Sequence, residues 1–167
     1  MRWRLLDQMT ELTEKRAAAS ASTGFPDTLF ADHFPGFPTT PGVLLVEMCA
    51  QLGGRLVEIR CSQAAGLLVL PVLTIVREAK FHAFVPPGRQ LRITAELEHV
   101  RPESALCIGE VFDGARRVAS MRLMFAFDPQ GRVAGGDREA LERFEREEFA
   151  RLGLHGFPPD PVFVGPC

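Results

Sequence analysis

Two side chains of this sequence, His33 and Glu47, are suited to acid–base chemistry by type and by position. His33 is the first histidine of the chain and lies in a stretch rich in proline and glycine, residues 33–42. Glu47 follows fourteen positions later and is surrounded by apolar residues. Histidine gains and loses a proton near neutral pH, and a carboxyl group in apolar surroundings can be held partly protonated. We therefore consider the two residues as a candidate base and acid.

A proline-rich loop and a helix are expected to position this pair. Residues 25–41 contain four prolines and two aspartates, which predicts a structured loop without regular secondary structure. Residues 42–60 contain no proline and are apolar around most of a helical circumference, which predicts a buried helix. One polar stripe runs along this helix, with residues spaced four, four and three apart: Glu47, Gln51, Arg55 and Glu58. The adjacent Gly53 and Gly54 lower helix propensity, so we expect another element to pack closely there.

The rest of the first 127 residues has the pattern of β-strands. Residues 91–99 alternate apolar and polar side chains, as a half-buried strand does. Asp113 and Gly114 lie between two further strand segments and predict a tight hairpin turn. Residues 67–76 are largely apolar and are expected to form a buried strand. The expected strands are 4–12, 16–23, 67–76, 80–85, 91–99, 105–112 and 116–127.

These elements indicate a single α+β domain with the hotdog fold. A helix that is apolar on nearly all sides must be covered, and a curved antiparallel β-sheet wrapped around it buries most of its surface. Pairing two such units covers the remaining surface. We assign residues 1–128 to this domain and residues 129–167 to a C-terminal extension. The extension is expected to hold an amphipathic helix over about 137–152, capped by Asp137, and a proline-rich tail.

Composition and charge argue against several other classes of protein. The 167 residues, 46% of them hydrophobic, suffice for one core, and a net charge of -2 with scattered basic residues argues against a nucleic-acid-binding protein. Early charged residues argue against a signal peptide, and the longest apolar run, residues 66–76, is too short to span a membrane. Cys49, Cys61, Cys107 and Cys167 are too widely spaced for a metal site or a disulfide framework. We expect a cytoplasmic protein with free thiols and with neither metal nor cofactor.

One long motif makes the candidate site recognisable. Residues 33–51 read HFPGxPxxPGVLxxExxAQ, which resembles the active-site motif of the hotdog-fold 3-hydroxyacyl-[acyl-carrier-protein] dehydratases of type II fatty acid synthesis. Residues 80–91, KFxxFVPPGxQL, are similar to the strand and turn that follow in that family, and residues 4–7 resemble the start of its first strand. The resemblance covers about residues 1–127, and its most specific part is the stretch from 33 to 51.

This resemblance implies the dehydration of 3-hydroxyacyl thioesters on acyl carrier protein to trans-2-enoyl thioesters, in fatty acid synthesis or in a related secondary lipid or polyketide pathway. It implies that His33 removes a proton from C2 and that Glu47 protonates or orients the leaving C3 hydroxyl. Free backbone N–H groups at the start of the helix could bind the thioester oxygen. The residues expected to contact the substrate are Phe34, Gly42, Val43 and Gln51.

The resemblance also implies how the protein assembles and which partner it meets. In the family, the histidine and the acid of one active site come from opposite subunits of a dimer. We therefore expect a homodimer, which could assemble further, with His33 of one chain beside Glu47 of the other. The acyl carrier protein is acidic, so a basic docking surface is expected near the tunnel mouth. Its candidate residues, which could equally be ordinary surface charges, are Arg77, Lys80, Arg89 and Arg92.

Two departures from the family pattern bear on the prediction. Asp32 stands where a glycine commonly precedes the histidine, and its negative charge is expected to favour the protonated form of His33 and so weaken it as a base. The chain has no tyrosine, so the tyrosine gate known in some members is absent. These departures suggest a specialised relative in a secondary pathway.

The sequence leaves three alternatives open. The protein could be a hotdog thioesterase, in which the carboxylate of Glu47 activates water against the thioester. It could also be a non-catalytic hotdog subunit that binds acyl carriers or pairs with an active homologue. Finally, His33 could be a structural hydrogen-bonding residue of its loop, and Glu47 could simply begin the polar stripe and bond to Gln51 one turn later.

Overall fold

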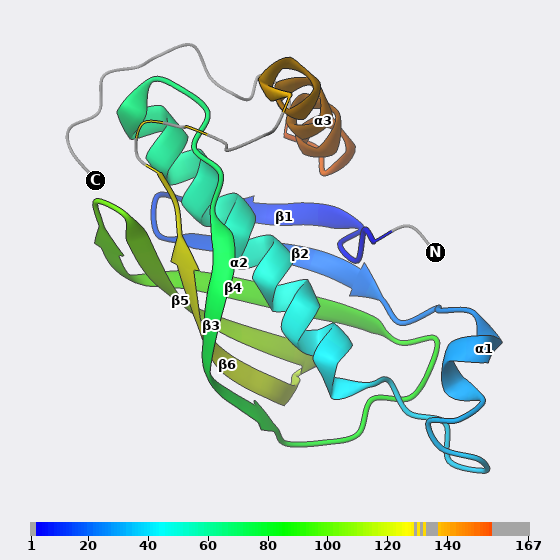
Figure 1. The fold of residues 1–167 in the computed structure, drawn as a ribbon. Coiled ribbons are helices and arrows are strands. Elements are labelled where there is room, and N and C mark those ends of the chain that lie inside the picture. Colours follow the sequence, from blue (N-terminus) through cyan, green and yellow to red (C-terminus); the bar gives the residue numbers. More distant parts are fainter. Residues whose placement is uncertain (1–2, 129, 131, 133–136, 155–167) are drawn as a thin grey trace.

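A curved antiparallel sheet packs along one long helix in this protein (Figure 1). The computed structural model describes residues 3–128, 130, 132 and 137–154. The helices are α1 (Asp27–Phe30), α2 (Gly42–Ala65) and α3 (Arg138–Arg151). The strands are β1 (Gln8–Leu12), β2 (Arg16–Ser22), β3 (Val72–Phe81), β4 (Gln90–Arg101), β5 (Ser104–Asp113) and β6 (Arg116–Ala126). Their order in the sheet is β1-β2-β4-β5-β6-β3, with antiparallel neighbours throughout, which confirms the predicted hotdog architecture.

The best-predicted part of the sheet is the run from β4 to β6. In β4, Leu91, Ile93 and Ala95 are buried, as the alternation of residue types predicts. In the hairpin of β5 and β6, Asp113 lies opposite Arg116, and Gly114 adopts a positive φ of 59° that suits a tight turn. These strands therefore follow their local sequence patterns.

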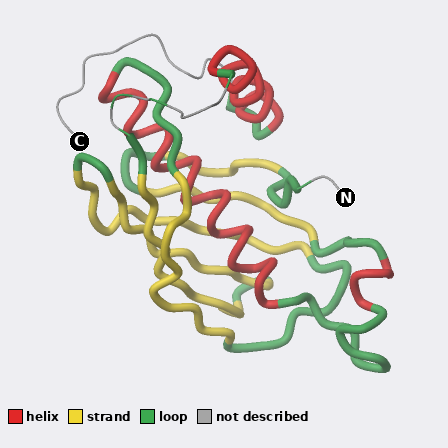
Figure 2. The backbone as a smooth tube through the Cα atoms, in the orientation of Figure 1, coloured by secondary structure: helices red, strands yellow, loops and turns green. Residues whose placement is uncertain are grey.

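Helix α2 lies across one face of the sheet (Figure 2). It begins at Gly42 as predicted and continues to Ala65, a few residues beyond the expected end. Gly66 ends it in the left-handed conformation (φ 66°), and its N–H group donates to the carbonyl oxygen of Ser62 at 2.9 Å. Most of its side chains are buried, which fits a sequence that is apolar on nearly every side.

The helix and the sheet approach each other closely at two glycines. A Cβ atom at Gly53 would lie 3.3 Å from the ring of Phe125, which confirms the close packing predicted there. A Cβ atom at Gly109, on β5, would lie only 2.8 Å from Cβ of Cys49 on α2. Real Cβ atoms essentially never come so close, so the glycine sets the spacing between the helix and this strand.

The prediction for residues 67–85 was wrong. A buried strand over 67–76 and a second strand over 80–85 were expected, whereas the structure has one strand, β3, at the edge of the sheet. Val72, Ile75 and Val76 on β3 are 63%, 49% and 45% exposed. An apolar sequence is also compatible with an edge strand, and in the described chain β3 has a sheet neighbour, β6, on one side only.

The loop before α2 also differs from the prediction, because it contains the short helix α1. Pro26 immediately precedes α1 and the next proline is Pro35, so the intervening residues can donate backbone hydrogen bonds. The N–H group of Ala31 donates to the backbone carbonyl oxygen of Asp27 at 3.0 Å and closes the single turn.

The expected C-terminal helix is present as α3. A carboxylate oxygen of Asp137 accepts a hydrogen bond of 3.1 Å from the N–H group of Ala140, which confirms the predicted cap. Phe149 and Leu152 are buried, so the helix docks its apolar edge on the rest of the chain. The predicted proline-rich tail lies outside the described residues, and the domain boundary at residue 128 stays a prediction. In the described part of the chain, no helix has both the length and the apolar character needed to cross a membrane.

Candidate functional site

The loop after α1 fixes the orientation of the His33 ring. Nδ1 of His33 lies 3.0 Å from the carbonyl oxygen of Thr39, and the N–H group of Thr39 donates back to the carbonyl of His33 at 2.9 Å. A carbonyl oxygen can only accept, so Nδ1 is the nitrogen that carries a proton, and in the neutral tautomer that proton lies on Nδ1. Nε2 is then the nitrogen with a free lone pair, which is what a base requires.

Phe34 and the following turn complete this loop. The ring of Phe34 stacks on that of His33 with 4.4 Å between centroids, although the Phe34 side chain is half exposed. Phe34 and Phe37 exchange two backbone hydrogen bonds around Gly36, whose φ is +75°. The N–H group of Thr40 donates to the carbonyl of Val85 at 2.7 Å. These contacts fix the position of the Phe34 ring and anchor the loop to the rest of the chain. Asp32 is exposed, and its expected effect on His33 stays a prediction.

The start of α2 presents backbone donors, as expected for a helix N-terminus. The N–H group of Leu44 donates to the carbonyl of Pro41 at 3.0 Å, whereas Gly42 and Val43 belong to the first turn, for which the helix itself supplies no acceptors. Val43 is 72% exposed. A Cβ atom at Gly42 would lie 2.9 Å from the Phe81 ring of β3. Gly42 therefore accommodates this ring, and its expected role in admitting a thioester stays a prediction.

Glu47 lies one turn into α2 and accepts two hydrogen bonds on one oxygen. The indole N–H of Trp3 and Nε2 of Gln51 each donate to Oε1 of Glu47 at 2.9 Å. The surroundings of this half-buried carboxyl group are therefore partly polar, not wholly apolar as the sequence predicted. Gln51 makes the expected contact one turn along the helix. Sequence reasoning missed Trp3, because no local pattern indicates a contact between residues 44 positions apart.

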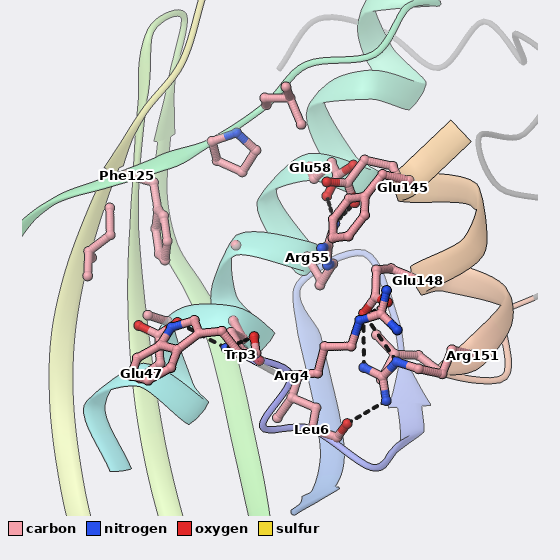
Figure 3. A pocket seen from close by; sticks show the side chains of 18 residues that line it. Trp3, Arg4, Leu6, Glu47, Arg55, Glu58, Phe125, Glu145, Glu148 and Arg151 are labelled. Carbon is pink, nitrogen blue, oxygen red and sulfur yellow. Dashed lines mark hydrogen bonds and ion pairs between the residues drawn. The ribbon is translucent and has the colours of Figure 1, made fainter. Parts of the chain in front are cut away.

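A pocket of about 320 Å³ begins at Glu47 and follows the polar stripe of α2 (Figure 3). Its other walls come from the N-terminal segment, from the region of Leu70 to Leu73, from β6 and from α3. Its lining residues are Trp3, Arg4, Leu6, Glu47, Ala50, Gln51, Gly54, Arg55, Glu58, Leu70, Pro71, Leu73, Phe125, Phe144, Glu145, Glu148, Arg151 and Leu152. His33, Phe34, Gly42 and Val43 are not among them. Within one chain, the structure thus joins Glu47 to Gln51 but does not bring His33 into the same pocket.

The far end of this pocket carries a buried charge cluster. Nη1 of Arg55 donates to Oε2 of Glu58 at 2.6 Å and also forms an ion pair with Glu145 of α3. Burial, together with the charge of Glu145, raises the pKa of Glu58 to about 8 against the lowering effect of Arg55. Burial likewise raises the pKa of Glu145 above its usual range. One guanidinium thus faces two carboxyl groups, which favours retention of a proton on the pair.

A second charge cluster joins α3 to the N-terminal segment. Nε of Arg4 lies 2.6 Å from Oε1 of Glu148, and Arg151 contacts Oε2 of the same carboxylate at 3.1 Å. Nη1 of Arg151 also donates to the carbonyl oxygen of Leu6 at 2.8 Å. The C-terminal extension is therefore part of the pocket wall.

The thiols of Cys49 and Cys107 are not suited to act as nucleophiles. Cys49 and Cys107 are buried, free cysteines. Burial raises the pKa of the Cys107 thiol to about 12 and also raises that of Cys49, so both stay protonated at neutral pH. Among the residues the structure describes, no cluster of His, Cys, Asp and Glu is suited to hold a metal ion.

All four basic residues considered for carrier docking have contacts within the chain, and Nη2 of Arg77 lies 3.9 Å from the sulfur of Met124. Arg89 binds both carboxylate oxygens of Asp113, Lys80 pairs with Glu78 at 2.7 Å, and Arg92 lies 4.1 Å from the centroid of the Phe112 ring. They remain exposed, so these contacts leave the docking prediction untested.

A family model and a curated relative that match this sequence are both dehydratases. A family model described as ApeI-like, ApeI dehydratase, matches residues 10–118. The 3-hydroxyacyl-[acyl-carrier-protein] dehydratase FabZ of Pelotomaculum thermopropionicum is 33% identical over 73% of this chain and 86% of that protein.

Solved structures support the fold. The dehydratase heterocomplex ApeI:P from Xenorhabdus doucetiae matches with a TM-score of 0.62 at 16% identity, over 86% of this chain and 90% of that one. A thioesterase from Haemophilus influenzae matches with a TM-score of 0.58 at 10% identity, over 75% of this chain and 80% of that one. At such identities the likeness concerns the fold alone, which is shared by enzymes of both activities.

Proposed function

Because the chain belongs to the ApeI-like dehydratase family, we propose that His33 and Glu47 are the base and the acid of its active site. The protein is a 3-hydroxyacyl-[acyl-carrier-protein] dehydratase, which converts a 3-hydroxyacyl thioester on acyl carrier protein to the trans-2-enoyl thioester. The observation that carries the proposal is the hydrogen bond from Nδ1 of His33 to Thr39, because it leaves Nε2 free to accept a proton.

His33 acts first in the proposed reaction. The proton on C2 of the substrate is acidified by the neighbouring thioester carbonyl. Nε2 of His33 takes this proton, and the electrons of the C–H bond move towards the carbonyl and then form the C2=C3 double bond. Backbone N–H groups of Gly42 and Val43 would stabilise the negative charge on the thioester oxygen, since the first turn of a helix has unused donors.

Glu47 completes the elimination. As the C3–O bond breaks, the leaving hydroxyl takes a proton from the carboxyl group and departs as water. Oε1 of Glu47 is engaged by Trp3 and Gln51, so Oε2 is the oxygen that holds and delivers the proton. Transfer of the C2 proton from His33 to solvent and reprotonation of Glu47 restore the starting state.

The proposed active unit is a homodimer with shared sites. His33 does not line the pocket that Glu47 opens, so one chain supplies the acid without its base. The edge strand β3 exposes Val72, Ile75 and Val76, an apolar edge that soluble proteins normally cover. Pairing of β3 with a second copy would cover this edge and bring the His33 loop of one chain towards Glu47 of the other.

A heterodimer is the alternative assembly. The ApeI:P dehydratase of Xenorhabdus doucetiae is a heterocomplex, so a homologous hotdog subunit is a second candidate for the surface on β3. This alternative predicts that the purified chain alone has little dehydratase activity and gains it when the second subunit is added. The thioesterase alternative rests on fold likeness only.

Mass spectrometry of carrier-bound 3-hydroxyacyl chains tests the proposal. Wild-type protein should remove water from the chain, whereas a thioesterase would remove the whole acyl group. His33→Ala and Glu47→Gln should each lower the rate about 100-fold or more. Full activity in both variants would refute the assignment of the two residues. Circular dichroism of each variant provides the control for folding.

A further inference from the structure

The backbone of the N-terminal segment, residues 3–6, is attached to α2 through the side chain of Gln51. Nε2 of Gln51 donates to the carbonyl oxygen of Trp3 at 3.2 Å, and Oε1 of Gln51 accepts from the N–H group of Leu5 at 3.0 Å. The amide of Gln51 thus satisfies backbone groups of two residues as a neighbouring strand would. Leu5 and Leu6 are buried, which holds the segment against the core.

The opposite side of the segment is attached to α3. Arg4 pairs with Glu148, and Arg151 donates to the carbonyl oxygen of Leu6 at 2.8 Å (Figure 3). Both ends of the segment are therefore fixed, and the place of Trp3 beside Glu47 is set by contacts from two helices.

The contact between Trp3 and Glu47 is specific in its geometry. The indole N–H donates to Oε1 at 2.9 Å, although Trp3 is 60% exposed. An indole ring that remains mostly in solvent gains little from burial, so its N–H group is what the site uses. Trp3 precedes the residues 10–118 that match the family model, so the motif that identified the site does not include it.

We propose that Trp3 is a positioning residue for the acid of the active site. Its indole N–H, together with the amide of Gln51, keeps Oε1 of Glu47 occupied and turns Oε2 towards the substrate. This inference rests on the proposed function, in which Glu47 protonates the leaving hydroxyl. Without the indole donor, the carboxyl group keeps one hydrogen bond on Oε1 and can rotate. Oε2 then points towards the bound substrate for a smaller fraction of the time.

Steady-state kinetics of Trp3→Phe test this role, because phenylalanine keeps an aromatic ring and removes only the N–H donor and the second ring. A hydrogen bond between uncharged groups is worth a factor of up to about 10, so kcat should fall by up to about tenfold while KM changes less than about twofold. Retention of the wild-type kcat would refute the proposal. Thermal unfolding of the same sample checks that the fold is intact.

A double-mutant cycle separates positioning from a general structural effect. Glu47→Asp keeps a carboxyl group but shortens the side chain, so the contact with the indole should be lost while some activity remains. Trp3→Phe should then cause no further loss in the Glu47→Asp background. An equal tenfold loss in both backgrounds would show that Trp3 acts independently of Glu47 and would overturn the inference.

Fluorescence gives a readout that does not depend on activity. Trp3 is the only tryptophan of the chain, so its emission reports this site alone. Removal of the carboxyl acceptor in Glu47→Ala should shift this emission, whereas the control Glu11→Ala on β1 should keep the wild-type spectrum. A wild-type spectrum in Glu47→Ala would contradict the contact. Full dehydratase activity of Glu47→Gln, by contrast, would refute the proposed function itself.

Discussion

Arg55 on α2 and Glu145 on α3 form a buried ion pair between residues 90 positions apart in the sequence. Glu58 approaches the same guanidinium from the next turn of α2. The C-terminal helix is therefore attached to the central helix by one cation that serves two carboxyl groups.

This arrangement predicts that replacing the shared cation destabilises the protein more than replacing one of the two carboxyl groups. Arg55→Met leaves two buried carboxyl groups without their cation and should lower the free energy of unfolding by about 3–5 kcal/mol. Glu145→Gln leaves Arg55 paired with Glu58 and should cost only about 1 kcal/mol. Urea denaturation of both variants measures the difference. Equal losses would contradict the sharing of one guanidinium.

The stability of the protein should decrease as the pH rises from about 4.5 to about 8. The folded protein holds the pKa of Glu58 at about 8, above the ordinary value of 4.5, so it binds a proton more tightly than the unfolded chain does. This contribution is complete below pH 4.5 and is lost as the pH passes through about 8. Arg55, Glu145 and Glu148 are the charged groups around this site and affect the midpoint.

Unfolding free energies at several pH values between 5 and 9 measure this dependence. Glu58→Gln cannot bind or release the proton, so its stability should vary less over the same range than that of the wild type. The exposed carboxylate Glu11 provides the matched control, since Glu11→Gln should keep the wild-type slope. A wild-type slope in Glu58→Gln would assign the pH dependence to other groups.

Mixing two inactive variants should restore activity if the sites are shared between chains. After subunit exchange, half of the dimers contain one His33→Ala and one Glu47→Gln chain, and one of their two sites has both functional residues. We expect about a quarter of the wild-type activity in the mixture. Each variant alone serves as the control. No recovery, in a mixture shown to exchange subunits, would contradict the shared site.

A charge on the exposed edge of β3 should prevent dimer formation. Ile75→Lys and Val76→Lys place a solvated cation on the apolar edge, so they should shift the protein to monomers and lower dehydratase activity in parallel. Light scattering during gel filtration measures the oligomeric state. Leu12→Lys on β1, the opposite edge of the sheet, is the matched control and should leave the mass unchanged. Intact dimers of both β3 variants would exclude this edge as the interface.

Local patterns predicted most of the fold. The start of α2, the alternation in β4, the turn at Asp113 and the cap at Asp137 each depend on residues close in sequence. The strand β3 was mispredicted because residue types indicate how apolar a segment is, not whether another strand covers it. An edge that is paired in an assembly has the same sequence signature as a buried strand.

The candidate site was predicted only in part. The motif identified His33, Glu47 and Gln51, and the structure adds the tautomer of the histidine through Thr39. The contact of Trp3 with Glu47 and the ion pair of Arg55 with Glu145 depend on the folded path of the chain. Residue types alone could not indicate them, because single aromatic or charged residues have many possible partners.

The contact between Gly109 and Cys49 limits how the two positions can evolve. Any side chain at 109 begins with a Cβ atom, and only glycine at 49 removes the atom that it would meet at 2.8 Å. For the glycine to move from position 109 to position 49 by single substitutions, an intermediate protein must therefore have glycine at both positions. That intermediate loses roughly a few tenths of a kcal/mol of helix propensity in addition to the packing of the Cys49 side chain. Descendants of this protein should consequently keep glycine at 109 even where the surrounding core residues change.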